Sequence, residues 1–191
     1  MARWLDALLG RTRPRQPDLD ALFSLPGAAV TLEAAAGLRP TGKAGVCFKP
    51  ASGRAFEQTG GELDDLLAFA ARESGSRLST SDDTYGYRWI VVDDPDLEDV
   101  VTAAHMVNTT LKERGFGPQL LCSVFGFARP AGADPCHLVY LYKRGTFYPF
   151  APRAGERRDN ELELRVRGAV DDELPVEDDL TRWFPLWGAP V

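Results

Sequence analysis

The fold is decided by residues 119–127, QLLCSVFGF, which are apolar at odd and at even positions. In a strand, Leu121 and Phe125 would point to one side and Leu120 and Val124 to the other. A strand that is apolar on both faces is typical of the middle of a sheet. We therefore expect residues 119–127 to form a central strand with side chains packed on both of its faces.

Other strands are expected on either side of this segment in the sequence. Residues 128–135 contain Pro and Gly and predict a hairpin loop that leads to a second strand over 136–142. Residues 45–49 and 87–92 also have the composition of strands. Residues 160–170 alternate between apolar and charged side chains, which predicts a strand with one face in solvent.

The clearest predicted helix runs from Pro95 to Arg114. Asp94 is a natural N-cap, Pro95 suits the first helical position and Gly115 suits the end. The residues expected on its buried stripe are Leu97, Val100, Val101, Ala104, Val107 and Leu111. A further helix is expected over 62–72, whereas 28–35 is compatible with a helix or a strand.

This order of elements, with strands in adjacent pairs and helices between them, predicts an α+β fold. We expect a mainly antiparallel sheet with helices packed on one face. Residues 1–17 are expected to form a short amphipathic helix followed by a linker rich in Pro and Arg, and residues 18–191 a single domain. The aromatic residues at 183–187 predict a tail that packs on the body of the domain.

Composition and charge restrict the classes of partner. The chain has 191 residues and a net charge of −6 at pH 7, which disfavours nucleic acid. The charge is uneven, because residues 1–15 carry a net +3 and residues 171–179 a net −6. We find no secretory signal and no run close to the roughly 18 apolar residues of a membrane span, so we expect a cytoplasmic protein.

One segment comes close to a nucleotide-binding motif. Gly37, Gly42 and Lys43 satisfy G-x-x-x-x-G-K, the start of a P-loop. The next residue should be a Ser or Thr that holds Mg²⁺, but it is Ala44. The loop should also lead into a helix, whereas a strand is expected here. We therefore expect no nucleotide at this position.

The histidines and cysteines do not form a recognisable site. Cys47, Cys122 and Cys136 are widely spaced, which favours buried, reduced thiols. His105 and His137 have no neighbour at the spacing of metal ligands, and no nucleophile motif accompanies them. We expect no catalytic residue, no metal and no cofactor, and therefore a protein that acts by binding a partner.

The most unusual segment is basic and aromatic, and it spans residues 143–159. Its candidate partner-binding residues are Lys143, Arg144, Phe147, Tyr148, Arg157 and Arg158. Arginines beside aromatic rings can bind phosphate, an acidic peptide or a stacked ring. A purely structural loop is equally compatible with this pattern. An alternative is a small-ligand pocket or an unrecognised enzyme site in which these bases converge with Asp159.

The N-terminal segment is a second candidate binding surface. Its apolar residues at helical spacing, flanked by arginines, are Trp4, Leu5, Leu8 and Leu9. Burying them would contribute about 1.5–3 kcal/mol each, while ordering about nine residues costs about 1–2 kcal/mol each. Such a helix would bind a membrane surface weakly on its own. We favour an external partner, namely a protein groove or the inner face of the plasma membrane, over docking on its own domain.

Several long segments together resemble one family. They are WLDALLGRTRP (4–14), PDLDALFSLPGAAVTL (17–32), GFGPQLLCSVFGF (115–127), LVYLYKRGTFYPFAP (138–152), ERRDNELELRVRGA (156–169) and DLTRWFPLWGAP (179–190). This pattern is similar to the PspAB family, small proteins encoded beside phage shock protein A in high-GC Gram-positive bacteria. The resemblance runs from Trp4 to Pro190 and is poor between Ala51 and Ser81.

The resemblance implies an accessory or regulatory role in the membrane-stress response. Phage shock protein A, a coiled-coil membrane protein, is the partner that it implies, and no enzymatic activity or catalytic residue comes with the family. The order of elements is also similar to small sheet domains of the secretion-chaperone and YbjN kind, which implies a fold and no function. A homo-oligomer, such as a chaperone-like dimer, stays open as a third alternative.

Overall fold

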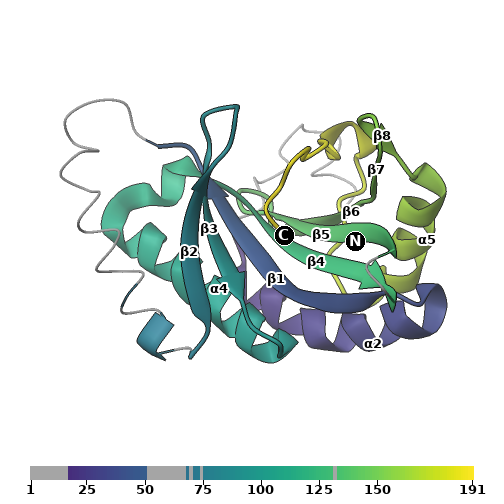
Figure 1. Ribbon diagram of the computed structural model, residues 1–191, viewed down its shortest axis with the longest axis horizontal. Helices are drawn as coiled ribbons and strands as arrows, with labels where there is room; N and C mark the ends of the chain where they lie inside the picture. The colour runs from purple at the N-terminus through teal and green to yellow at the C-terminus, as the bar shows by residue number, and fades with distance from the viewer. Residues whose placement is uncertain (1–16, 51–67, 69–70, 74, 131–132) are drawn as a thin grey trace, which may run out of the picture.

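The computed structural model describes residues 17–50, 68, 71–73, 75–130 and 133–191. These residues build an α+β fold around a six-stranded sheet in the order β2-β3-β1-β4-β5-β6, in which all neighbouring strands are antiparallel (Figure 1). The strands are β1 (Arg39–Phe48), β2 (Arg77–Asp82), β3 (Arg88–Asp93), β4 (Leu120–Arg129), β5 (Ala133–Leu141) and β6 (Thr146–Phe150). A separate two-stranded ribbon consists of β7 (Pro152–Arg153) and β8 (Arg157–Arg158).

The prediction of a central strand at 119–127 is confirmed. β4 pairs with β1 on one side and with β5 on the other. Leu120, Val124 and Phe125 are fully buried, so both faces of β4 are covered. The predicted hairpin to β5 and the strand at 87–92 are also present, and the strand expected at 45–49 begins earlier, at Arg39.

Two helices cover one face of this sheet, and the one over 97–111 was expected from its periodicity. They are α2 (Leu25–Ala36), preceded by the 3-10 turn η1 (Leu19–Ser24), and α4 (Leu97–Leu111) (Figure 1). Apart from Leu97, which is partly buried, the stripe predicted for α4 is buried. Its N-cap is Asp96, whose side chain accepts the Glu98 N–H at 2.8 Å, and not Asp94, which instead accepts the Asp96 N–H at 2.9 Å. Two short turns, η2 (Lys112–Phe116) and η3 (Gly117–Gln119), connect α4 to β4.

The prediction of a strand at 160–170 is wrong, because α5 (Asn160–Val170) is a helix. Asp159 caps it by accepting the Leu162 N–H at 2.9 Å. Leu162, Val166 and Val170 recur every fourth residue and are buried, whereas Leu164, apolar in the alternating pattern, is 53% exposed. An apolar residue at every fourth position fits a helix as well as a strand, and the cap at Asp159 favours the helix.

The segment 28–35, which was open between helix and strand, belongs to α2. The stretch Leu19–Ala36 reaches the length and mean hydropathy of a membrane span, contrary to the expectation that no run does so. Leu22, Leu25 and Leu32 are fully buried against the rest of the fold. A core helix that packs in this way has the same composition as a span, so its hydropathy does not indicate a membrane.

Two of the predicted helices fall mostly or wholly outside the described residues. Of the helix expected over 62–72, residues 68 and 71–72 are described, and they are helical. The helix expected within residues 1–17 lies outside the described residues.

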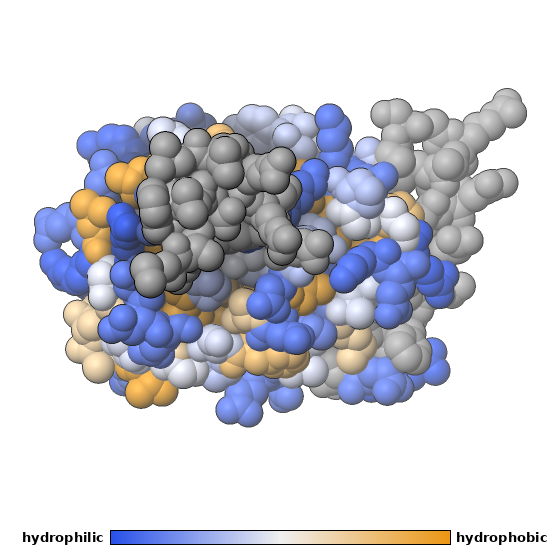
Figure 2. All heavy atoms as spheres, turned by 180° about the vertical axis from the view of Figure 1, so that it is seen from behind, coloured by the Kyte–Doolittle hydropathy of each residue, from blue (hydrophilic) through white to orange (hydrophobic). Residues whose placement is uncertain are grey.

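The C-terminal tail packs on the body, as predicted. Residues 175–177 run parallel to β6 along its outer edge, where the Phe147 N–H donates to the Pro175 carbonyl at 2.8 Å and the Glu177 N–H to the Phe147 carbonyl at 2.7 Å. The tail then passes 3-10 turn η5 (Leu180–Arg182), buries Trp183 and continues to Val191 over the face opposite α2 and α4 (Figure 1). Seen from behind, apolar surface outside the grey atoms is broken into separate patches among hydrophilic side chains (Figure 2).

Candidate functional site

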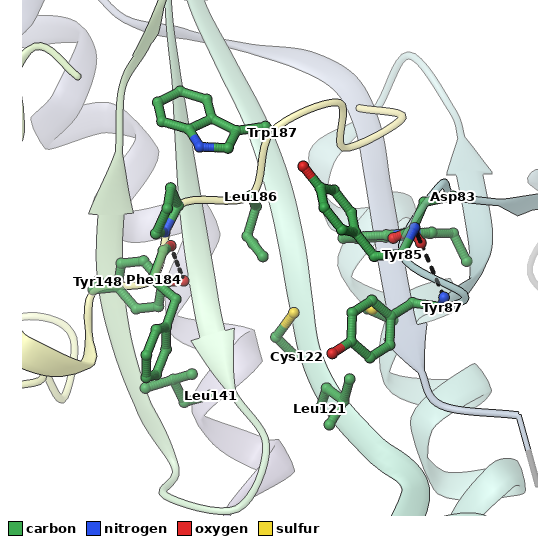
Figure 3. A pocket seen from close by; sticks show the side chains of 13 residues that line it. Asp83, Tyr85, Tyr87, Leu121, Cys122, Leu141, Tyr148, Phe184, Leu186 and Trp187 are labelled. Carbon is green, nitrogen blue, oxygen red and sulfur yellow. Dashed lines mark hydrogen bonds between the residues drawn. The ribbon is translucent and has the colours of Figure 1, made fainter. Parts of the chain in front are cut away.

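A pocket of about 610 Å³ opens on the sheet face that α2 and α4 leave uncovered (Figure 3). Ser123 of β4 points toward α4, because the Asn108 side chain donates to its hydroxyl at 2.8 Å. Its neighbour Cys122 therefore points to the opposite face, into the pocket. The lining residues are Cys47, Asp83, Tyr85, Tyr87, Trp89, Leu121, Cys122, Leu141, Tyr148, Phe184, Pro185, Leu186 and Trp187.

One wall of the pocket is the turn between β2 and β3, which Asp83 organises. One of its carboxylate oxygens accepts the N–H groups of Tyr85 and Tyr87, both at 2.9 Å, and the other accepts the indole N–H of Trp89 at 3.0 Å. Burial alone would raise the pKa of Asp83, but these hydrogen bonds hold it below its usual range. The carboxylate is thus used to position three aromatic residues.

The opposite wall is built by β6 and the C-terminal tail. The Tyr148 hydroxyl donates to the Phe184 carbonyl at 2.8 Å, as Figure 3 shows. Trp183 stacks on the Tyr148 ring with centroids 6.1 Å apart, and Trp187 meets Phe150 edge-on at 5.0 Å. These ring contacts attach the tail to the sheet, and they leave Phe184 59% exposed at the rim of the pocket.

The floor of the pocket contains two cysteines. Cys47 of β1 and Cys122 of β4 are direct partners across the two strands, and both thiols are free. The neighbouring Cys122 thiol, together with burial, raises the pKa of Cys47. Burial of reduced thiols agrees with the prediction from the sequence. Their pairing was missed, because residues 75 positions apart carry no local signal that β1 and β4 place them side by side.

This lining is suited to an apolar group. Asp83 is the one charged residue among the described lining residues, and both of its oxygens already accept hydrogen bonds from the pocket wall. The volume lies within the ~300–1,000 Å³ of typical ligand pockets. Tyr85, 64% exposed, and Phe184 present large aromatic rings at its rim. Exposed rings beside an apolar hollow mark a surface where a partner can bury apolar side chains.

The residues predicted within the basic and aromatic segment lie in different surroundings. Phe147 is fully buried, so a partner cannot contact it. Tyr148 is also buried, but it lines the aromatic pocket. Arg144 pairs with the buried Glu177, and Arg158 pairs with Glu163 at 2.8 Å and donates to the Trp183 carbonyl. These arginines hold the tail and α5 in place.

The exposed bases of the segment are Lys143, Arg153 and Arg157, and Arg153 forms ion pairs with Asp134 and Asp159. The alternative site, in which the bases converge with Asp159, is not formed. Arg144, Arg158 and Asp159 each border a different shallow hollow, and none of them lines the aromatic pocket.

The remaining residues considered in the sequence do not gather around the pocket. His105 lies 3.5 Å from Asp20 on the helical side of the sheet. His137 is buried in β5, and its Nδ1 atom has no hydrogen-bond partner in the described part of the chain. Within that part, no group of three or more His, Cys, Asp or Glu side chains could hold a metal ion. Trp4, Leu5, Leu8 and Leu9 lie outside the described residues.

The glycines of the P-loop-like segment have conformational roles. Gly37 adopts a left-handed conformation, with φ of 67°, and ends α2. Gly42 has φ of 78° inside β1, and its carbonyl accepts the Asp94 N–H at 2.9 Å. A strand therefore occupies the place where a P-loop would begin its helix, as the sequence predicted.

Comparison with known proteins gives one match. The sequence model of the PspAB family, described as PspA associated protein B, matches residues 2–191. No curated protein matches the chain. No solved structure matches it either, so the similarity to secretion-chaperone or YbjN domains stays a prediction.

Proposed function

Because the chain belongs to the PspAB family, we propose that it is an accessory protein of the PspA-dependent membrane-stress response that binds PspA through its aromatic pocket. The family description names an association with PspA and assigns no molecular activity. The observation that carries the proposal is a pocket of about 610 Å³ whose described lining is mainly aromatic and aliphatic, with Asp83 as its one charged residue.

The chemistry of the pocket favours binding over catalysis. Asp83 holds the pocket wall through three hydrogen bonds, which leaves little capacity for proton transfer. The two cysteines of the floor are buried, and a thiol without a nearby base is a weak nucleophile. The aromatic rim supplies contact area instead, and large rings of this kind dominate the energetics of protein interfaces.

The place of action in this proposal is the cytoplasmic face of the plasma membrane. The net charge of +3 over residues 1–15 supports it, because basic segments are attracted to anionic lipid by about 1 kcal/mol per residue. In this arrangement the N-terminal segment contacts the membrane surface and the pocket holds PspA.

A second candidate is a small apolar ligand in the same pocket. Its volume and aromatic walls are those of small-molecule sites, and the thiols and leucines of its floor would contact a hydrocarbon or a planar ring. A ligand of this kind would compete with PspA for the pocket.

The direct test is the affinity of the purified full chain for PspA, measured by titration calorimetry. The informative variant is Tyr85→Ser with Phe184→Ser, because both side chains are exposed and can be shortened without opening the core. We expect at least a ten-fold loss of affinity. The matched control is Val30→Ser with Leu164→Ser, which removes two exposed apolar side chains from α2 and α5. This control should bind as the parent chain does.

Two further variants test the surfaces that the sequence suggested. One carries Lys143→Ala and Arg157→Ala, and the other lacks residues 1–15. Loss of binding in either variant with full binding in the Tyr85 and Phe184 variant would overturn the pocket as the PspA site. Full binding in all variants would have the same consequence.

A further inference from the structure

Cys47 and Cys122 form a pair whose geometry suits a disulfide bond. They occupy directly opposed positions on β1 and β4, so their side chains leave the sheet on the same face. Opposed residues of antiparallel strands have Cα atoms about 4.5–5.5 Å apart, and disulfides span about 4.4–6.8 Å. Both side chains also line the same pocket floor, so the two thiols face one space. The backbone spacing and the side-chain direction therefore both permit a disulfide bond between Cys47 and Cys122.

The ladder is irregular beside this pair. The register between β1 and β4 shifts after Cys47, where Phe48 pairs with Leu120 and Leu121 is left as an extra residue. A bulge of this kind lets one strand bend locally. The β carbons of opposed residues are about 4.5–5.5 Å apart, slightly more than the roughly 3.5–4.5 Å in a disulfide, and the bulge can supply this adjustment.

The pair is also reachable from the pocket. Both cysteines line the hollow between the β2–β3 turn and the C-terminal tail. A small uncharged molecule that enters the hollow would meet both sulfur atoms. Cys136 provides the contrast, because it lies on the other side of the sheet and does not line this pocket.

We propose that Cys47 and Cys122 are a thiol–disulfide exchange site, which a small uncharged disulfide entering the pocket converts into a reversible cross-strand disulfide. One thiol loses its proton, and its sulfur attacks the entering disulfide. A mixed disulfide forms and one small thiolate leaves. The second cysteine, deprotonated in turn, attacks the protein sulfur of the mixed bond, and the other small thiolate leaves. The chain loses two protons and two electrons, which the oxidant gains as two thiols.

This inference does not depend on the proposed binding of PspA. It concerns the floor of the pocket, while binding was assigned to the rim. The raised pKa of Cys47 keeps thiolate scarce near neutral pH, so the exchange is expected to be slow without excess oxidant. The reduced pair is then the resting form, and the disulfide forms under oxidising stress.

The experiment treats the folded full chain with 2-hydroxyethyl disulfide and counts free thiols after denaturation. The chain has three cysteines, and we expect the count to fall from three to one. Peptide mapping without reductant should then join the peptides of Cys47 and Cys122, with a mass lower by two hydrogen atoms. Dithiothreitol should restore all three thiols.

Single variants identify the partners. Cys136→Ala should still lose two thiols, whereas Cys47→Ala and Cys122→Ala should form no intramolecular bond. The proposal is overturned if the folded parent chain retains three thiols, if the bond includes Cys136, or if the reaction stops at a mixed disulfide. Because the peptide map of the parent chain gives the result directly, a variant that fails to fold leaves the test intact.

Discussion

The indole N–H of Trp89 donates to the Asp83 carboxylate across 3.0 Å and ties β3 to the turn that precedes it. The same indole ring lies against Gly45 of β1, where a β carbon would stand 2.9 Å from the Trp89 Cε3 atom. The turn, β3 and β1 therefore support one wall of the aromatic pocket together. A substitution of Asp83 or Gly45, the two residues that contact Trp89, should therefore lower the stability of the fold and alter the shape of the pocket.

Asp83→Ala removes the acceptor for three N–H groups. At about 0.5–1.5 kcal/mol for each of the three hydrogen bonds, we expect a loss of about 1.5–4.5 kcal/mol in the free energy of unfolding, measured with urea. The matched control is Asp82→Ala, one residue earlier, which removes an exposed ion pair with Arg88 and should cost below about 1 kcal/mol. Equal effects of the two substitutions would contradict the role given to Asp83.

Gly45→Ala introduces a β carbon between two side chains. It would lie 2.9 Å from Trp89 and 3.1 Å from Val191, so the tail or the indole has to move. We expect destabilisation by about 1–3 kcal/mol, measured by thermal and urea unfolding. Gly168→Ala in α5 is the control, because no atom of the described residues lies within 4 Å of the place that its β carbon would take. Alanine there favours the helix by about 0.5–1 kcal/mol. Gly45→Ala should therefore lower the free energy of unfolding, and Gly168→Ala should raise it.

His137 should make stability depend on pH. Burial lowers the pKa of His137 to about 4, whereas the unfolded chain keeps about 6.5. Below pH 6.5 the unfolded state binds more protons, so the free energy of unfolding falls as the pH decreases toward 4, by up to about 3 kcal/mol. His137→Phe should remove this dependence of the unfolding free energy on pH, and His105→Gln should retain it. An unchanged slope in His137→Phe would refute the assignment.

Arg157 and Arg158 are adjacent but should differ strongly. Arg158 pairs with the buried Glu163, and Arg158→Ala would leave that carboxylate without its cation. We expect a loss of about 3 kcal/mol in unfolding free energy. Arg157 is exposed and donates to the Ala154 carbonyl, so Arg157→Ala should change stability by less than about 0.5 kcal/mol. Chemical denaturation of the two single variants tests whether Arg158 stabilises the fold and Arg157 does not.

The helix α5 shows how one sequence pattern can fit two structures. Residues 160–170 predict a strand because apolar residues stand at every second position. The same residues place Leu162, Val166 and Val170 at every fourth position, which suits a helix equally. Asp159 and the ion pair between Arg165 and Glu161 stabilise the helix locally. Asp159 was a signal for a helix in the sequence, but the prediction followed the alternating pattern instead.

The composition of the basic and aromatic segment was equally compatible with a binding face and with a purely structural loop. The fold buries Phe147 and engages Arg144 and Arg158 in ion pairs with Glu177 and Glu163, which gives these three side chains a structural role. These carboxylates come from later in the chain. Composition cannot show which arginines find such partners, because the pairing depends on where the tail and α5 pack.

What the sequence determined by itself was local. Residues 119–127 are apolar on both faces and had to lie inside a sheet, and the periodic stripe of 97–111 had to face it, because exposing either would leave large apolar surfaces in water. The tertiary structure alone decided that Cys47 meets Cys122 and that the tail completes an aromatic pocket with the β2–β3 turn. These contacts join residues far apart in the chain, and their distances follow from strand pairing and packing rather than from spacing along the sequence.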